Sequence, residues 1–165
     1  LSVNPSNSAA LQGEYMAYFS TKTYGHNIGL SACFRQPHAD HSHCRFLHGY
    51  SLQFKFTFGC NMLDNKNWVV DFGGLKPLKK WLEDNFDHKV VLDSKDWALD
   101  NFRALEDAGL AELNILDGVG VEKFAEHAYN KAQEIVNEMS DGRCWVVSCE
   151  CAEHGANSAI YQAVV

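Results

Sequence analysis

The stretch LQFKFTF at residues 52–58 decides the fold class of this chain. Apolar and polar side chains alternate along it, and a period of two is typical of a β-strand with one buried face. A second strand is predicted at residues 68–72 (WVVDF), beyond a turn at residues 61–67 (NMLDNKN). We expect these two strands to pair as an antiparallel hairpin.

Amphipathic helices are predicted on the C-terminal side of this hairpin. Leu75, Leu78 and Leu82 recur at helical spacing within residues 75–85. A longer apolar stripe marks a helix over residues 122–139, and its members are Phe124, Ala128, Ala132, Ile135, Val136 and Met139. Residues 96–109 are a further predicted helix, which Gly109 ends.

Predicted strands lie on both sides of these helices. Residues 14–34 favour one or two strands with a break at residues 24–27, and residues 87–92 form a short extended piece. Residues 144–151 and 158–165 supply the last strands. This order predicts an α+β fold, in which an antiparallel sheet carries two main helices packed on one face. Edge-to-edge assembly of subunits into a ring would cover the open edges of such a sheet.

Length and composition limit the class of protein. The 165 residues fit one domain, which we place at residues 15–165 after a flexible arm at residues 1–14. Hydrophobic residues make up 46% of the chain, enough to bury a core. The net charge of −7 argues against nucleic acid or an anionic membrane as a partner. No apolar run approaches the roughly 20 residues of a membrane span.

The six cysteines allow two interpretations, three disulfides in a secreted protein or reduced thiols. Residues 1–11 (LSVNPSNSAAL) contain no basic segment followed by an apolar run. Four Trp, ten Phe and six Tyr also provide a core that does not need disulfides. We therefore expect reduced thiols and a cytoplasmic protein.

Side chains that can bind metal or transfer protons gather between residues 26 and 48. This segment holds five of the eight histidines and two cysteines, namely His26, His38, His41, His43 and His48 with Cys33 and Cys44. One interpretation is a polar loop whose histidines are solvated. The other is a metal or acid–base site, and the density of these residues does not decide between the two.

A family resemblance becomes visible at residues 44–51 (CRFLHGYS). This segment resembles the motif C-x-x-L-H-G-H-[SN] of the 6-pyruvoyltetrahydropterin synthase / 6-carboxytetrahydropterin synthase family. Four further pieces resemble the family in the same order along the chain. SACFRQPH at 31–38 resembles the family's A-A-H-R-L-P-H segment, and WVVDFGGLK at 68–76 resembles its D-F-x-x-L-K segment. FDH at 86–88 resembles its L-D-H segment, and Glu153 resembles its last glutamate. The resemblance covers roughly residues 18–162.

The resemblance implies a tunnelling fold, an antiparallel sheet with two helices on one face, whose subunits assemble into a barrel. It also implies a homo-oligomer with substrate sites between subunits and a small-molecule pterin as its partner. The implied activity is that of a lyase on dihydroneopterin triphosphate or a related pterin, which eliminates triphosphate and moves protons along the side chain. No nucleotide cofactor is expected.

The resemblance also implies catalytic residues. Cys44 stands at the family's catalytic thiol, which would abstract a proton from the substrate side chain. The neighbouring His43 and Arg45 independently favour a reactive thiol over an inert one. Asp87 and His88 stand at the family's acid–base pair, although an Asp-His dipeptide at a helix end is by itself more typical of a structural role.

Two glutamates are implied to bind the substrate. Glu153 matches the carboxylate that accepts hydrogen bonds from the 2-amino and N3 hydrogens of the pterin, and Glu150 is the alternative if the register differs. Glu122 begins the second long helix, where the family often has a glutamate. Its alternative role is to stabilise the positive end of the helix dipole.

The chain departs from the family at the metal site. The family binds zinc with three histidines, and here Phe34 and Tyr50 replace two of them, so that His48 alone remains. Because zinc sites need at least three protein ligands, we expect the usual site to be absent. Zinc could then be held only by substitutes from a set comprising Cys33, His26, His41, His43 and His154.

This departure leaves three functions open. In the family, zinc polarises the oxygens of the substrate side chain. A divergent enzyme would need another electrophile, Tyr50 or Arg35, and Tyr50 is also a predicted substrate-binding residue. The first alternative is a non-catalytic pterin- or purine-binding protein of the same fold. The second is another tunnelling-fold enzyme of purine or pterin metabolism.

Overall fold

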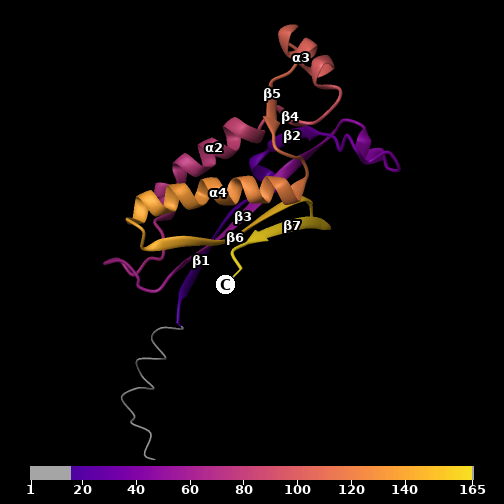
Figure 1. The fold of residues 1–165 in the computed structure, drawn as a ribbon. Coiled ribbons are helices and arrows are strands. Elements are labelled where there is room, and N and C mark those ends of the chain that lie inside the picture. Colours follow the sequence, from indigo (N-terminus) through magenta and orange to yellow (C-terminus); the bar gives the residue numbers. More distant parts are fainter. Residues whose placement is uncertain (1–15, 165) are drawn as a thin grey trace, which may run out of the picture.

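The computed structural model describes residues 16–164, which form one mixed sheet with helices packed against it (Figure 1). The strands are β1 (Tyr18–Tyr24), β2 (Leu30–Phe34), β3 (His48–Cys60), β4 (Lys89–Asp93), β5 (Leu113–Leu116), β6 (Cys144–His154) and β7 (Asn157–Gln162). The helices are α2 (Lys76–Phe86), α3 (Leu99–Asp107) and α4 (Val121–Ser140). The predicted arm at residues 1–14 lies outside the described residues.

Strand β3 is the centre of the sheet. Its first part pairs with β2, from Phe34 opposite His48 to Leu30 opposite Leu52. Its second part pairs with β1, and its other edge pairs with β6 along residues 53–60. All these pairs are antiparallel, as is the pair of β6 with β7. The strand predicted at residues 52–58 is therefore confirmed and is longer than its apolar pattern indicated.

The sheet is not antiparallel throughout. Strand β4 pairs with β2, and β5 pairs with β4, in parallel. Strand β4 follows α2 and β5 follows α3, and parallel neighbours need such long connections instead of a hairpin. The expected antiparallel sheet with two helices thus describes the larger part of the sheet, and the parallel strands extend it.

Helices α2 and α4 cover one face of the sheet and contact each other (Figure 1). Phe54, Phe56 and Phe58 alternate on that face of β3 and are fully buried. The ring of Phe86 from α2 lies between those of Phe54, at 5.0 Å, and Phe124 of α4, at 5.3 Å. Each such buried ring contributes roughly 1.5–3 kcal/mol of hydrophobic stabilisation.

The hairpin strand predicted at residues 68–72 is wrong. These residues form bends and then a 3-10 turn at Phe72–Leu75, where Asp71 accepts the Gly73 N–H at 2.9 Å. The Arg143 guanidinium donates to the carbonyl oxygens of Trp68 (3.3 Å) and Val69 (2.9 Å). The Trp68 carbonyl also accepts the Asp64 N–H at 3.1 Å, so the backbone here is held by a local turn and by a distant side chain, and it pairs with no strand among residues 16–164.

Helix α3 stands apart from the other helices, beyond the end of the sheet that holds β4 and β5 (Figure 1). It covers a small separate core of Leu92, Ala98 and Phe102. Its position confirms the helix predicted within residues 96–109. Within residues 16–164, none of the helices combines the length and the apolar character needed to cross a bilayer.

Candidate active site

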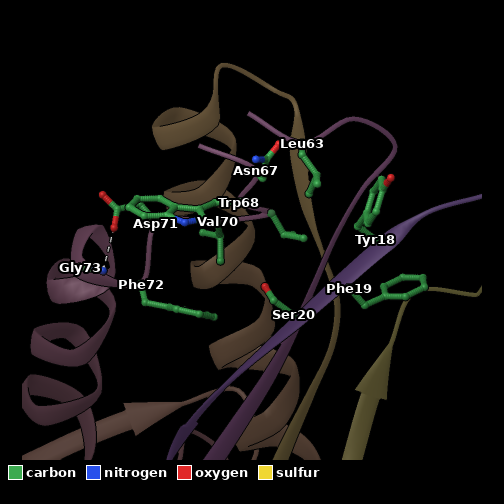
Figure 2. A pocket seen from close by; sticks show the side chains of 11 residues that line it. Tyr18, Phe19, Ser20, Leu63, Asn67, Trp68, Val70, Asp71, Phe72 and Gly73 are labelled. Atoms are coloured by element: carbon green, nitrogen blue, oxygen red, sulfur yellow. Dashed lines mark hydrogen bonds between the residues drawn. The ribbon is translucent and has the colours of Figure 1, made fainter. Parts of the chain in front are cut away.

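Two cavities differ in the chemistry of their walls. The larger, of about 560 Å³, lies between the start of β1 and residues 63–73, and its wall includes the rings of Tyr18, Trp68 and Phe72 (Figure 2). The carboxylate in that wall is Asp71, which already accepts the Gly73 N–H. Among the described residues that line this cavity there is neither a thiol nor an imidazole.

The smaller cavity, of about 230 Å³, brings together four of the predicted site residues. A thiol, an imidazole and two carboxylates line it, from Cys44, His48, Glu122 and Glu153. The rest of the wall consists of Phe34, Gln36, Gly120, Val121, Asn157 and Ser158. These groups come from three regions distant in sequence (34–48, 120–122 and 153–158), and their convergence makes this cavity the candidate active site.

Cys44 lies in a 3-10 turn (His43–Arg45) that precedes β3. Its N–H donates to Ser42 Oγ at 3.1 Å, and its carbonyl accepts the Gln36 N–H at 2.8 Å. Cys44 is exposed, whereas Cys149 and Cys151 are fully buried. Burial raises the pKa of both those thiols well above the ordinary range, so they are inert. Cys44 is thus the accessible thiol at the cavity.

Strand β6 decides between the two candidate glutamates. Cys149 and Cys151 point into the core, and Glu153, two residues further on, shares their face and reaches the cavity. Glu150 lies on the opposite face, where its partner across the strands is the exposed Lys55. The register that places Glu153 at the cavity therefore excludes Glu150 from it.

Glu122 occupies the first turn of α4, at the edge of the same cavity. The segment before it is held by Gln36, whose Nε2 donates to the Val119 carbonyl at 2.8 Å. Gly120 has φ of +110°, a left-handed value that favours glycine and lets the chain turn into the helix. Gln36 was not predicted as a site residue, and neither were Asn157 and Ser158.

The region where the family holds its metal is filled by aromatic rings. Phe34 lies opposite His48 across β2 and β3, with ring centroids 5.4 Å apart, and Tyr50 lies 5.4 Å from His48 on the same face. A Cβ at Gly49 would be 2.9 Å from the Ala32 carbonyl oxygen, so glycine permits this close approach of the strands. Both replacements therefore face the surviving histidine.

The residues present do not fit a zinc ion. His48 Nδ1 lies 2.7 Å from the Phe46 carbonyl oxygen, which leaves Nε2 as its one free ligand atom. Among residues 16–164 no three His, Cys, Asp or Glu side chains are arranged to hold a metal. Of the substitutes, His26 Nδ1 faces the Ser51 carbonyl at 2.5 Å and His154 Nδ1 accepts the Ala156 N–H at 3.1 Å.

The two alternative electrophiles differ in availability. The Tyr50 ring lies between those of His48 and His154, and partial burial, with the charges of Glu153 and Cys44, raises the pKa of Tyr50. Its hydroxyl therefore stays protonated at neutral pH and can donate a hydrogen bond. Arg35 is excluded as an electrophile, because its guanidinium is held by Asp96 at 2.8 and 2.9 Å.

Asp87 and His88 are not brought to the cavity of their own chain. His88 Nδ1 lies 2.7 Å from Asp87 Oδ1, and the imidazole is 85% exposed. The pair forms the turn between α2 and β4, where the His88 N–H donates to the Ser31 carbonyl at 2.7 Å. His88 has φ of +56°, an uncommon value for a residue with a side chain. The dyad is ordered and its imidazole is exposed, and neither residue lines the cavity that holds Cys44.

Most of the chain matches one known protein family. The model of the family described as 6-pyruvoyl tetrahydropterin synthase matches residues 25–163. A 6-carboxy-5,6,7,8-tetrahydropterin synthase of Rickettsia typhi is 43% identical over 54 residues, which are 32% of this chain and 39% of that protein. The corresponding protein of Rickettsia conorii is 41% identical over the same length. The aligned part thus spans 39% of the length of these curated relatives.

Solved structures share the fold at low sequence identity. An uncharacterized protein from Wolinella succinogenes has a TM-score of 0.71 with 16% identity, covering 89% of this chain and 98% of its own. A 6-pyruvoyl tetrahydropterin synthase from Plasmodium falciparum has a TM-score of 0.65 with 14% identity, covering 90% and 99%. The tunnelling fold is therefore confirmed.

Proposed function

This chain belongs to the 6-pyruvoyl tetrahydropterin synthase family, and from that premise we propose that it is a 6-carboxytetrahydropterin synthase-like lyase. The proposed substrate is dihydroneopterin triphosphate or a related pterin. The observation that carries the proposal is the single cavity lined by Cys44, His48, Glu122 and Glu153. The free thiol of Cys44 and the other five unpaired cysteines support a reducing, cytoplasmic location.

Three groups that line the cavity, and Tyr50 beside His48, have roles in this proposal. The Glu153 carboxylate accepts two hydrogen bonds from the amino edge of the pterin and thereby fixes the ring. The Cys44 thiolate then removes a proton from the substrate side chain, and triphosphate departs with its bonding electrons. Glu122 assists in binding the ring, and the Tyr50 hydroxyl donates a hydrogen bond to a side-chain oxygen.

We place the Asp87–His88 dyad in the cavity of a neighbouring subunit. Its exposure and ordered geometry support this placement, because an acid–base pair needs a substrate within hydrogen-bond reach. Within the described residues, β1 pairs only with β3, and β7 pairs only with β6, so one edge of each is open. Tyr18, Phe19 and Ile160 are exposed near these edges. Pairing of such edges between copies would close a barrel.

The first prediction concerns assembly. Light scattering after size-exclusion chromatography should give a mass that is a multiple of the 18.5 kDa chain. The physical reason is that open strand edges and exposed aromatic rings are costly to leave in water. A stable monomer at micromolar concentration would contradict the shared site.

The second prediction tests the pterin anchor. Glu153→Gln should weaken pterin binding by about 2–4 kcal/mol, because a charge-assisted acceptor is replaced by an amide that presents a donor. Quenching of pterin fluorescence measures the affinity. Glu150→Gln is the matched control on the same strand, and its affinity should equal that of the parent. If Glu153→Gln bound the pterin as tightly as the parent does, Glu153 would be excluded as the anchor.

A second candidate function rests on the replaced ligands at Phe34 and Tyr50. A non-catalytic pterin- or purine-binding protein would keep the Glu153 anchor without turnover. Incubation with dihydroneopterin triphosphate, followed by detection of released triphosphate, separates this candidate from the lyase. Binding without release of triphosphate would favour the binding protein.

A further inference from the structure

A buried ion pair lies next to the candidate site and has no role in the proposed reaction. Among residues 16–164, Asp96 is the one charged residue that is buried, and its side chain is 0% exposed. Arg35 Nε lies 2.8 Å from Asp96 Oδ2, and Arg35 Nη2 lies 2.9 Å from Oδ1. Both carboxylate oxygens are thus engaged by one planar guanidinium, the bidentate arrangement that fixes orientation.

The surroundings keep both partners charged. Burial alone would raise the pKa of Asp96, but hydrogen bonds from Arg35 and from the Ala98 N–H, with a nearby His38, bring it below its ordinary value. The hydrogen bond to Asp96 in turn raises the pKa of Arg35. The indole of Trp97 lies against the guanidinium, with 5.0 Å between Arg35 Cζ and the ring centroid.

The third arm of this guanidinium reaches the loop that carries the thiol. Arg35 Nη1 donates to the Arg45 carbonyl at 3.1 Å, one residue after Cys44. The next residue along the chain, Gln36, donates its N–H to the Cys44 carbonyl at 2.8 Å. Two consecutive residues at the end of β2 therefore hold two consecutive carbonyls around the thiol. Asp96, just before α3, fixes the first of these anchors.

We propose that Asp96 and Arg35 are positioning residues, which hold the Arg45 carbonyl and thereby place the Cys44 thiol at the cavity. A buried ion pair adds little net stability compared with apolar packing of the same volume, whereas an arginine fork gives defined geometry. In this arrangement the segment that begins α3 stabilises, through Asp96, the loop that holds Cys44. The catalytic part of this inference rests on the proposed lyase function.

The test compares Asp96→Asn with Asp100→Asn, a change on α3 at a side chain that is 96% exposed. Trypsin cleavage after Arg45, followed by mass spectrometry, reports opening of the loop without any assay of activity. We expect cleavage in Asp96→Asn to be about tenfold faster, because cleavage tracks the population of the open loop. Cleavage after the exposed Lys66, far from this loop, should be unchanged and serves as the internal reference.

The kcat and KM of the same variants distinguish a positioning role from a general effect on the folded structure. Asp96→Asn should lower kcat by about 100-fold, the effect of a reacting group displaced by roughly 1 Å. KM should stay near that of the parent, because Glu153 still binds the ring. Arg35→Lys keeps the charge but cannot bridge Asp96 and the Arg45 carbonyl together, so it should show the same split. Arg35→Lys also decides the matter if Asp96→Asn fails to fold.

The outcomes keep the two proposals apart. Absence of turnover in the parent would overturn the lyase function, while cleavage after Arg45 would still decide whether Asp96 holds the loop. If Asp96→Asn and Arg35→Lys matched Asp100→Asn in both cleavage and kcat, the positioning role would be wrong. Equal loss of kcat without faster cleavage would also overturn it, because the effect would not pass through the loop.

Discussion

Cys44→Ser is expected to lower turnover by about two to four orders of magnitude, the range found when a positioned acid or base is removed. A hydroxyl of ordinary acidity does not supply the base that a thiolate does. Affinity for the pterin should change little, because Glu153 still accepts from the ring. Release of triphosphate measures turnover, and fluorescence quenching measures affinity.

The matched control is Cys33→Ser. Cys33 neighbours Phe34 on β2 but points to the other face of the sheet, and burial raises the pKa of its thiol. This variant should turn over like the parent. Turnover of Cys44→Ser at the parental rate would show that another group is the base.

The Cys44→Ser variant also tests whether the site is shared between subunits. His88→Ala should be inactive, and mixing it with Cys44→Ser under conditions of subunit exchange should restore turnover. One of the two kinds of hybrid cavity then combines the intact Cys44 of a His88→Ala subunit with the intact His88 of a Cys44→Ser subunit, while the reciprocal cavity carries both substitutions. Persistent inactivity of the mixture would place both residues in one subunit's site.

The spacing of apolar residues was enough to predict the strands and helices that have one clearly buried face. The alternation in residues 52–58 and the apolar stripe in residues 122–139 each specify one buried face, so β3 and α4 were predicted in type and place. Residues 68–72 are as apolar as a strand, but long-range hydrogen bonds from Arg143 determine their conformation. No local pattern reports a partner more than 70 residues away.

The site shows the same division. The motif at residues 44–51 located Cys44 and His48, and the family resemblance indicated Glu153 with Glu150 as the alternative, which the structure excludes from the cavity lining. Gln36 was missed because its role depends on the Val119 carbonyl, 83 residues away, and Arg35 was misread because its partner Asp96 is 61 residues away. A glycine at position 120, just before a helical pattern, is the signal that could have indicated the cavity edge.

The double change Phe34→His with Tyr50→His is expected to create a zinc site where the parent has little affinity. In the parent the rings at positions 34, 48 and 50 have centroids 5.4, 5.4 and 5.9 Å apart, all on one face of β2 and β3. Three imidazoles at these positions would supply the minimum number of protein ligands for zinc. Each single variant has only two, and should bind weakly.

Elemental analysis after dialysis gives the stoichiometry, and thermal unfolding with zinc and with a chelator gives the coupling to stability. A ligand at about 100 times its Kd stabilises the folded state by about 2.7 kcal/mol, so the melting temperature of the double variant alone should rise with zinc. The Phe46 carbonyl already holds His48 Nδ1, which presents Nε2 to the ion. A tightly held zinc in the parent would contradict this prediction and would require ligands from residues 38–43 or from His154.

The assay of turnover on these proteins then decides between the two candidate functions. If the double variant binds zinc and releases triphosphate, and the parent does neither, the parent is a binding protein that has the fold of a lyase. If the parent itself releases triphosphate without metal, Cys44 and the Asp87–His88 dyad suffice together with another electrophile. Tyr50 is the available candidate, because its phenol remains protonated and Arg35 is committed to Asp96. Tyr50→Phe should then abolish turnover and leave pterin binding in place.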